Sequence, residues 1–192
     1  MSERPYRQTE RAASVAATQT AILDAVDAIF LPDPGTAFTL DQVAKQSGAT
    51  VQTILRHFGS KSKLIEASAQ RGFASTRAGR DDVPVADLPA IAHYLAEHYE
   101  SVGPMVLRML GAEADGDAIA EMNESGRDMH RAWVERVFGP MLGGGTSAAR
   151  RRRLATLIAV TDLLTWKLLR LEQGLSARDY ERCVRDLLER LR

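Results

Sequence analysis

Four polar residues, Gln52, Thr53, Arg56 and His57, have the types and the spacing to contact DNA from one short segment. In a major groove a glutamine amide suits adenine, an arginine guanidinium suits guanine, and a valine such as Val51 suits the methyl group of thymine. The segment therefore favours base reading by Val51, Gln52 and Arg56, provided that it forms a helix.

Two short helices are predicted to position these side chains. Thr39 is an N-cap residue type, and the apolar residues at 40, 43 and 44 recur at helical spacing. Gly48 suits the left-handed backbone that ends a helix, and Thr50 is placed to cap a second helix. That helix carries apolar positions of its own at Val51, Ile54, Leu55 and Phe58.

Two helices joined by a short glycine-containing turn are typical of a helix-turn-helix, whose second helix enters the major groove. An ordinary helical hairpin with a solvated charged face has the same periodicity, so periodicity alone leaves both interpretations open.

The ordered residues between 39 and 61 narrow this choice. They are Thr39, Val43-Ala44, Gly48-Ala49-Thr50, Thr53-Ile54-Leu55-Arg56-His57-Phe58 and Ser60-Lys61. This series resembles the DNA-binding domain of TetR/AcrR family transcriptional regulators, and residues 21–30 are similar to the first helix of that domain. The resemblance covers roughly residues 14–75.

The resemblance implies a regulator of double-stranded DNA that binds a palindromic operator. The expected DNA-binding residues are Thr39, Thr50, Val51, Gln52, Thr53, Arg56, His57, Ser60 and Lys61. One position departs from the family pattern, since Leu55 stands where the family usually has a tyrosine that binds a backbone phosphate. Thr50, His57 and Lys61 are then expected to bind the backbone phosphates of the DNA, and Thr39 and Ser60 are expected to add further phosphate contacts.

The charge of the chain is uneven. The 192 residues are formally neutral, but residues 1–80 hold 10 basic and 7 acidic residues, whereas residues 81–192 hold 15 and 18. A basic N-terminal part fits a phosphate-binding role. The run Arg150 to Arg153 is interpreted as a solvated face rather than a second nucleic-acid site. Residues 1–13, with three arginines, are predicted to be a flexible basic arm that is either inert or reaches DNA beside the recognition helix.

The rest of the chain is predicted to be helical, because no strand-like alternation occurs. The expected fold is all-α with about nine helices: a three-helix DNA-binding domain at 14–75 and a helical ligand-binding and dimerisation domain at 76–192. Residues 76–85 are the expected boundary. Helices are predicted at 62–74, 87–101, 103–111, from Asp115 or Asp117 to Phe138, 146–173 and 177–191.

The helix predicted at 146–173 is apolar on nearly all sides, so part of it needs a cover from another copy of the chain. The last two helices are similar to those of one TetR subset, in which they pair with their mates. The expected interface of the homodimer consists of Leu157, Thr161, Leu164, Leu168, Tyr180, Val184, Leu187 and Leu188.

The middle helices are expected to enclose a small hydrophobic or amphipathic ligand. The candidate residues mix aromatic, soft and polar side chains, although each also suits a plain core: Tyr94, His98, Met105, Met109, Met122, His130 and Trp133. The family resemblance implies a repressor that this ligand releases. The alternative is a constitutive or architectural DNA-binding dimer that senses nothing.

Enzymatic chemistry has little support in the sequence. It contains no metal-binding His-Glu-x-x-His pattern and no Gly-x-Ser-x-Gly elbow, and Cys183 is the only cysteine. We expect no catalytic residue, metal or cofactor. No apolar run approaches the length of a membrane span, so a cytoplasmic location is expected.

Overall fold

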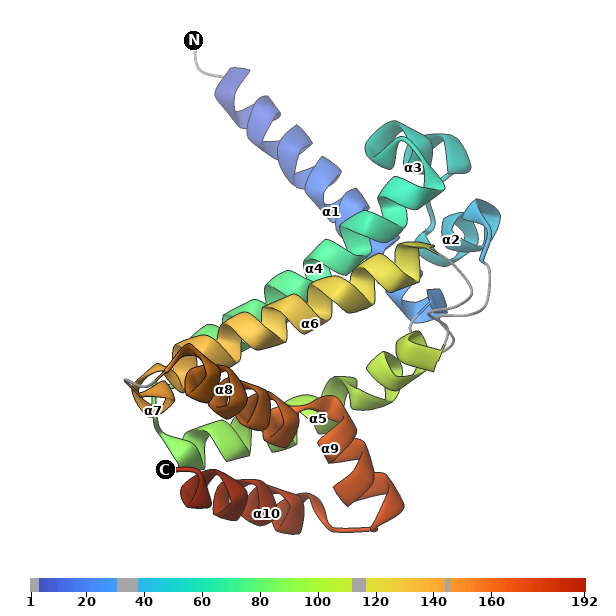
Figure 1. Cartoon of the computed structure of the whole chain (residues 1–192). Coiled ribbons are helices and arrows are strands. Elements are labelled where there is room, and N and C mark those ends of the chain that lie inside the picture. The colour runs from blue at the N-terminus through green and yellow to red at the C-terminus, as the bar shows by residue number, and fades with distance from the viewer. Residues whose placement is uncertain (1–3, 31–37, 112–116, 144–145) are drawn as a thin grey trace. The chain divides into compact units, whose positions relative to one another are not determined.

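The structure is a computed structural model that describes residues 4–30, 38–111, 117–143 and 146–192. Within these ranges the regular elements are all helices, which confirms the all-α prediction (Figure 1). The chain divides into two units, Met1–Gly72 and Phe73–Arg192.

The first unit is a small helical domain. It contains α1 (Arg4–Phe30), α2 (Leu40–Ser47), α3 (Val51–Phe58) and the first part of α4 (Lys61–Asp81). Each helix contributes apolar side chains to its core, and Phe38 adds one from the segment just before α2. These side chains are almost fully buried: Ile22, Ala25, Val26, Phe38, Val43, Ile54 and Leu64.

Helix α1 begins earlier than the sequence predicted. Residues 4–13 belong to the helix, so the flexible arm expected at 1–13 is wrong over this stretch, and residues 1–3 lie outside the described residues. Pro5 stands in the first turn, where a missing N–H has no helical partner to lose. No glycine or further proline follows before residue 31, so nothing in the sequence ends the helix early.

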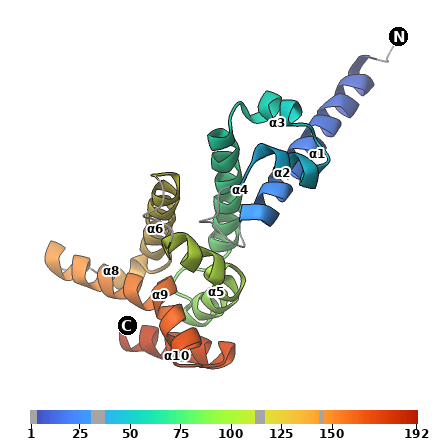
Figure 2. The ribbon, with the colours of Figure 1, turned by 90° about the vertical axis from the view of Figure 1, so that its right-hand side faces the viewer.

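The second unit contains the end of α4 and the remaining helices. These are α5 (Leu88–Gly111), α6 (Asp117–Val137), α7 (Gly139–Leu142), α8 (Ser147–Thr161), α9 (Leu163–Trp166), the π-helical segment η2 (Lys167–Glu172) and α10 (Ala177–Arg190). Helix α5 lies alongside α10 in both views and also packs against α6 and α9 (Figures 1 and 2). Because α4 continues to Asp81, much of the boundary expected at 76–85 is helical.

Helix α5 runs through Gly103-Pro104, where the sequence predicted a break. Gly103 is buried, and a Cβ added to it would lie 2.6 Å from Cζ3 of Trp166. The glycine is thus needed for a close approach of the indole ring rather than for a turn. The Gly-Pro pair favours a break in the helix, but the packing of α5 in the second unit outweighs this local preference.

Conversely, the helix predicted at 146–173 is interrupted. Asp162 is extended, with φ −76° and ψ 152°, and its carboxylate accepts a hydrogen bond of 2.8 Å from the backbone N–H of Leu164. Asp162 therefore acts as the N-cap of α9, and the chain changes direction there.

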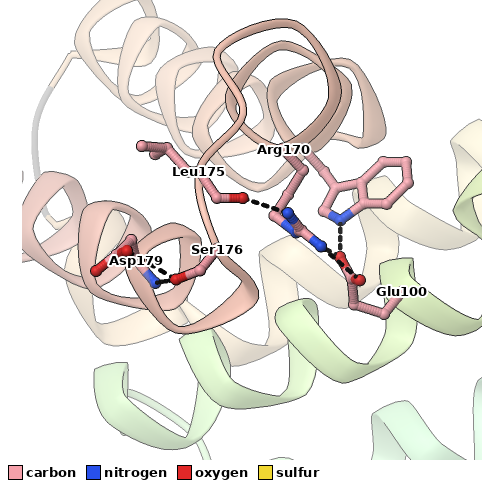
Figure 3. A network of polar contacts seen from close by, with 6 residues as sticks. Glu100, Arg170, Leu175, Ser176 and Asp179 are labelled. Carbon is pink, nitrogen blue, oxygen red and sulfur yellow. Dashed lines mark hydrogen bonds and ion pairs between the residues drawn. The ribbon is translucent and has the colours of Figure 1, made fainter.

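An ion pair holds the redirected chain against α5 (Figure 3). Arg170 donates to Glu100 from Nε at 2.7 Å and from Nη2 at 2.8 Å, and it also donates to the backbone carbonyl of Leu175. The indole N–H of Trp166 donates to the same carboxylate at 2.9 Å. Ser176 then caps α10 by accepting from the Asp179 N–H at 3.1 Å.

Most residues of the predicted dimer interface are buried within the chain itself, so the prediction is wrong for them. Five of the predicted residues, Leu157, Thr161, Tyr180, Val184 and Leu188, are fully buried within one chain. They have no surface left to offer a partner, because α10 folds onto its own α5 and α8. Leu187 is half-buried.

Three leucines of the same region remain open to solvent. Leu164 is 57% exposed and Leu168 is 46% exposed, and their place in a dimer interface stays a prediction. Leu171, which was not among the predicted interface residues, is 55% exposed. We call these three residues the leucine patch.

Candidate nucleic-acid interface

Helix α2 begins and ends at the residues that the sequence indicated. The Thr39 hydroxyl accepts from the Gln42 N–H at 3.2 Å, and the Gln42 side chain accepts from the Thr39 N–H at 2.7 Å, which completes a capping box. Gly48 is left-handed with φ 71°. Since the Thr39 hydroxyl serves as a cap, its contact with phosphate stays a prediction.

Helix α3 follows after a short turn. The Thr50 hydroxyl accepts from the Thr53 N–H at 3.1 Å and lies 2.9 Å from the Thr53 hydroxyl. Ile54 is 1% exposed and anchors the helix in the core together with Val43 of α2. The arrangement of α2 and α3 is that of a helix-turn-helix.

The opposite face of α3 is free for recognition. Gln52 and Arg56 are exposed and lie opposite Ile54 on the helix, and Leu55 is exposed on one side of them. Val51 and His57 are half-buried. The structure thus brings the two strongest base-reading candidates together on one open face. Contact between Val51 and a thymine methyl stays a prediction.

The start of α4 adds a positioned cation beside α3. The Ser60 hydroxyl caps α4 by accepting from the Lys63 N–H at 3.2 Å. The ammonium group of Lys61 lies 4.7 Å from the centre of the Phe38 ring, a cation–π contact that the sequence analysis missed. This contact restricts the Lys61 side chain and favours its predicted role as a phosphate contact.

Ionic contacts brace α4 against α1. Arg71 binds Asp24 at 2.7 Å and also binds Asp27, which in turn accepts from the Ser68 hydroxyl. In the sequence, the only sign of this ion pair was the spacing of Asp24 and Asp27, three residues apart on one predicted helix. These contacts hold the first part of α4 against α1 within the first unit.

Replacing Leu55 by tyrosine is expected to strengthen DNA binding by about tenfold, because one hydrogen bond to a charged phosphate contributes roughly 1.5 kcal/mol. Leu55 is 40% exposed, so the larger ring is accommodated. Titration of labelled operator duplex measures the effect. Leu55→Phe supplies the ring without the hydroxyl and is the matched control. Equal affinities for the two variants would remove any phosphate role from this position.

The predicted ligand residues are only partly brought together. Ring contacts join four of them: Tyr94 stacks on His98 at 5.2 Å between centres, and Trp133 lies 5.7 Å from both Tyr94 and His130. The methionines do not take part in these ring contacts; Met109 is buried, and Met105 and Met122 are half-buried. A buried arginine, Arg80, lies in the same cluster, and the sequence analysis missed it because it placed residue 80 in a linker.

The two histidines of this cluster are held neutral. Burial, with a contribution from the Arg80 charge, lowers the pKa of His98 to about 4 and that of His130 to about 3. Burial likewise raises the pKa of Tyr94, an effect that the Arg80 charge partly offsets.

A separate open groove of about 670 Å³ lies between α6, α8 and α9. Its lining includes Arg131, Ile158 and Leu164, so it borders the leucine patch. Among the described residues no cluster of histidine, cysteine and acidic side chains is suited to hold a metal ion, and no helix there is both long and apolar enough to cross a membrane.

Comparison with known proteins identifies the first unit. Residues 22–68 match the family described as Bacterial regulatory proteins, tetR family, and this range covers the end of α1, all of α2 and α3, and the start of α4. No match was found among curated proteins. Residues 22–68 therefore form a helix-turn-helix domain of the kind found in bacterial regulatory proteins of the tetR family, and this domain supports a role for the chain as a DNA-binding transcription regulator.

Proposed function

We propose that this protein is a cytoplasmic, homodimeric repressor that a small hydrophobic or amphipathic ligand releases from a palindromic operator. The observation that carries the proposal is the open face of α3, where Gln52 and Arg56 stand clear of the core in a tetR-type domain. Their side chains suit adenine and guanine in a major groove.

A homodimer suits this mode of binding, because two recognition helices about 34 Å apart meet successive major grooves. The leucine patch supports dimerisation, since it places three exposed leucines on one segment beside an apolar groove. Apolar surface of this kind marks an interaction site on a water-soluble unit.

Leu168→Glu is expected to weaken self-association at least tenfold, because it introduces a charge that has to be desolvated in the interface. Sedimentation velocity over a concentration series measures the dissociation constant. Val85 is 49% exposed in the same unit, and Val85→Glu is the matched control. If both variants associate like the unaltered protein, the leucine patch is not the interface.

Selection from a library of random DNA duplexes tests the proposed function. The full-length protein should enrich an inverted repeat whose half-sites lie about 10 base pairs apart, or a multiple of this spacing. Failure to enrich any sequence above the starting library contradicts specific DNA binding.

The ligand-release step is tested on the complex with the selected duplex. A ligand can release the DNA only if it binds the DNA-free state more tightly than the DNA-bound state. Release by a small amphipathic compound, with no effect of that compound on naked DNA, supports the repressor. A complex that withstands such compounds favours the constitutive or architectural dimer.

A further inference from the structure

Arg80 is the one buried arginine in the described part of the chain, and it is poorly satisfied. It is 5% exposed, and its Nε and Nη1 atoms have no hydrogen-bond partner among the residues that the structure describes. The guanidinium lies 5.4 Å from the centre of the Trp133 ring. Within the described residues it forms no ion pair with a carboxylate.

The hydrogen bond between Arg80 and His130 has a defined direction. Arginine only donates, so Nη2 donates to Nδ1 of His130 at 3.3 Å, and that nitrogen carries no proton. The proton of the neutral ring is then on Nε2, which donates to the Thr161 hydroxyl at 3.1 Å. Thr161 donates onward to the Leu157 carbonyl at 2.8 Å. This chain holds the guanidinium in place but brings it no negative charge.

The other unsatisfied groups of the cluster are also hydrogen-bond donors. Among the described residues, the Trp133 indole N–H and the Tyr94 hydroxyl are buried without a hydrogen bond of normal geometry, and the Tyr94 hydroxyl also interacts with Arg80. The Trp133 ring lies beside the Arg80 guanidinium, and the Tyr94 ring lies beside the Trp133 ring, so all three side chains belong to one cluster. A set of donors around a buried cation matches a ligand group that accepts hydrogen bonds and carries negative charge.

A single carboxylate fits this set better than a phosphate. The planar guanidinium binds a carboxylate through parallel hydrogen bonds, and one cation balances one negative charge. His98 and His130 are neutral here and add no charge to balance a dianion. The rings of Tyr94 and His98 stack on each other, and both side chains are only half-buried, so the cluster reaches the surface of α5 and an aromatic ring can join the stack from there.

We propose that the buried Arg80, with Tyr94 and Trp133, is the receptor for the carboxylate of the ligand, and that the ligand is an aromatic monocarboxylate. This inference rests on the proposed function, since it names the chemical class of the releasing ligand. Arg80 lies on α4, the helix that begins next to α3 and includes residues of both units.

Calorimetric titration of the full chain tests the proposal with benzoate, phenylacetate and 1-naphthoate, each paired with its primary amide. The amide keeps the shape of the acid but is neutral. At least one acid should bind about tenfold or more tightly than its amide. Equal affinity within every pair, or no binding of any acid at millimolar concentration, overturns the proposal.

Arg80→Met should abolish the preference for the acid, whereas Arg77→Met, which changes an exposed arginine one turn away, should leave it intact. Without ligand, Arg80→Met should melt no lower than the unaltered protein, because it removes a buried charge without a counter-ion. A lower melting temperature with unchanged acid binding would make Arg80 a structural residue only. If Arg80→Met does not fold, the affinities of the unaltered protein for each acid and its amide still test the carboxylate receptor.

Binding of the selected duplex by the same preparation separates this inference from the proposed function. Release of the duplex by an amide or another neutral compound, but by no acid, overturns the carboxylate receptor and leaves the repressor standing. A preparation that binds acids through Arg80 but enriches no DNA sequence supports the receptor and contradicts the repressor.

Discussion

Lowering the pH from 7.5 to 5 is expected to destabilise the second unit by about 2 kcal/mol for each of His98 and His130. In the folded protein their pKa values are about 4 and about 3, against 6.5 for the unperturbed side chain. The largest cause is burial, which disfavours the charged imidazolium. The nearby Arg80 charge adds repulsion in both cases.

The direction follows from proton binding. Below pH 6.5 the unfolded chain takes up protons that the folded unit refuses, so acid favours unfolding. The contribution of each histidine to stability is complete above pH 6.5 and declines by about 1.4 kcal/mol per pH unit until its folded pKa is reached. Carboxylates titrate mainly below this range.

Urea unfolding between pH 7.5 and 5 measures the effect, with tryptophan fluorescence as the probe. Both tryptophans of the chain, Trp133 and Trp166, lie in the second unit. His130→Gln keeps an acceptor for Arg80 but does not titrate, so it should halve the pH dependence. A free energy of unfolding that stays constant over this range would contradict neutral, buried histidines.

Gly103→Ala is expected to destabilise the second unit by about 1–3 kcal/mol through overpacking. Its Cβ would lie 2.6 Å from Cζ3 and 2.8 Å from Cη2 of Trp166. The indole cannot easily withdraw, because it is 2% exposed and its N–H is bound to Glu100. Urea unfolding followed by fluorescence also reports on this ring directly.

Gly126→Ala is the matched control in another helix. Nothing lies within 4 Å of a Cβ at Gly126, and alanine is the better helix former by about 1 kcal/mol, so this variant should gain stability. A Gly103→Ala protein as stable as Gly126→Ala would show that the contact with Trp166 imposes no constraint.

The helix-turn-helix of the first unit could be predicted from the sequence because its signals are local. Caps at Thr39 and Thr50, the left-handed Gly48 and the apolar spacing of α2 and α3 lie within 20 residues, and each specifies the backbone near itself. The resemblance of this segment to the tetR family is confirmed by the match at residues 22–68. The all-helical prediction, which came from the absence of strand-like alternation, is confirmed for the described residues.

The second unit was less predictable because distant packing decides its details. Gly103 lies inside α5, and the reason for a glycine there is the ring of Trp166, 63 residues later in the chain, which leaves no room for a Cβ. Asp162 interrupts a segment whose apolar residues predicted one uninterrupted helix. Tyr180 and Val184 looked like interface residues, but burial within the same chain follows only from the tertiary fold.

The buried arginine had no local signal. Arginine is usually exposed, and Arg80 stood between Gly79 and two aspartates in a stretch that looked like a linker. Only the packing of α4 with α5 and α6 brings Tyr94, Trp133 and His130 around it.

Reading of the operator by α3 is tested most directly with three variants of the protein. The affinity of each variant is measured for the selected duplex and for duplexes with single base-pair changes. Gln52→Ala and Arg56→Ala should each lose about 1–3 kcal/mol on the preferred sequence and relax the preference at one base pair. Lys61→Ala should weaken binding to all duplexes about equally and reduce the salt dependence by about one counter-ion. Unchanged affinity and unchanged preference in all three variants would contradict DNA reading by this helix.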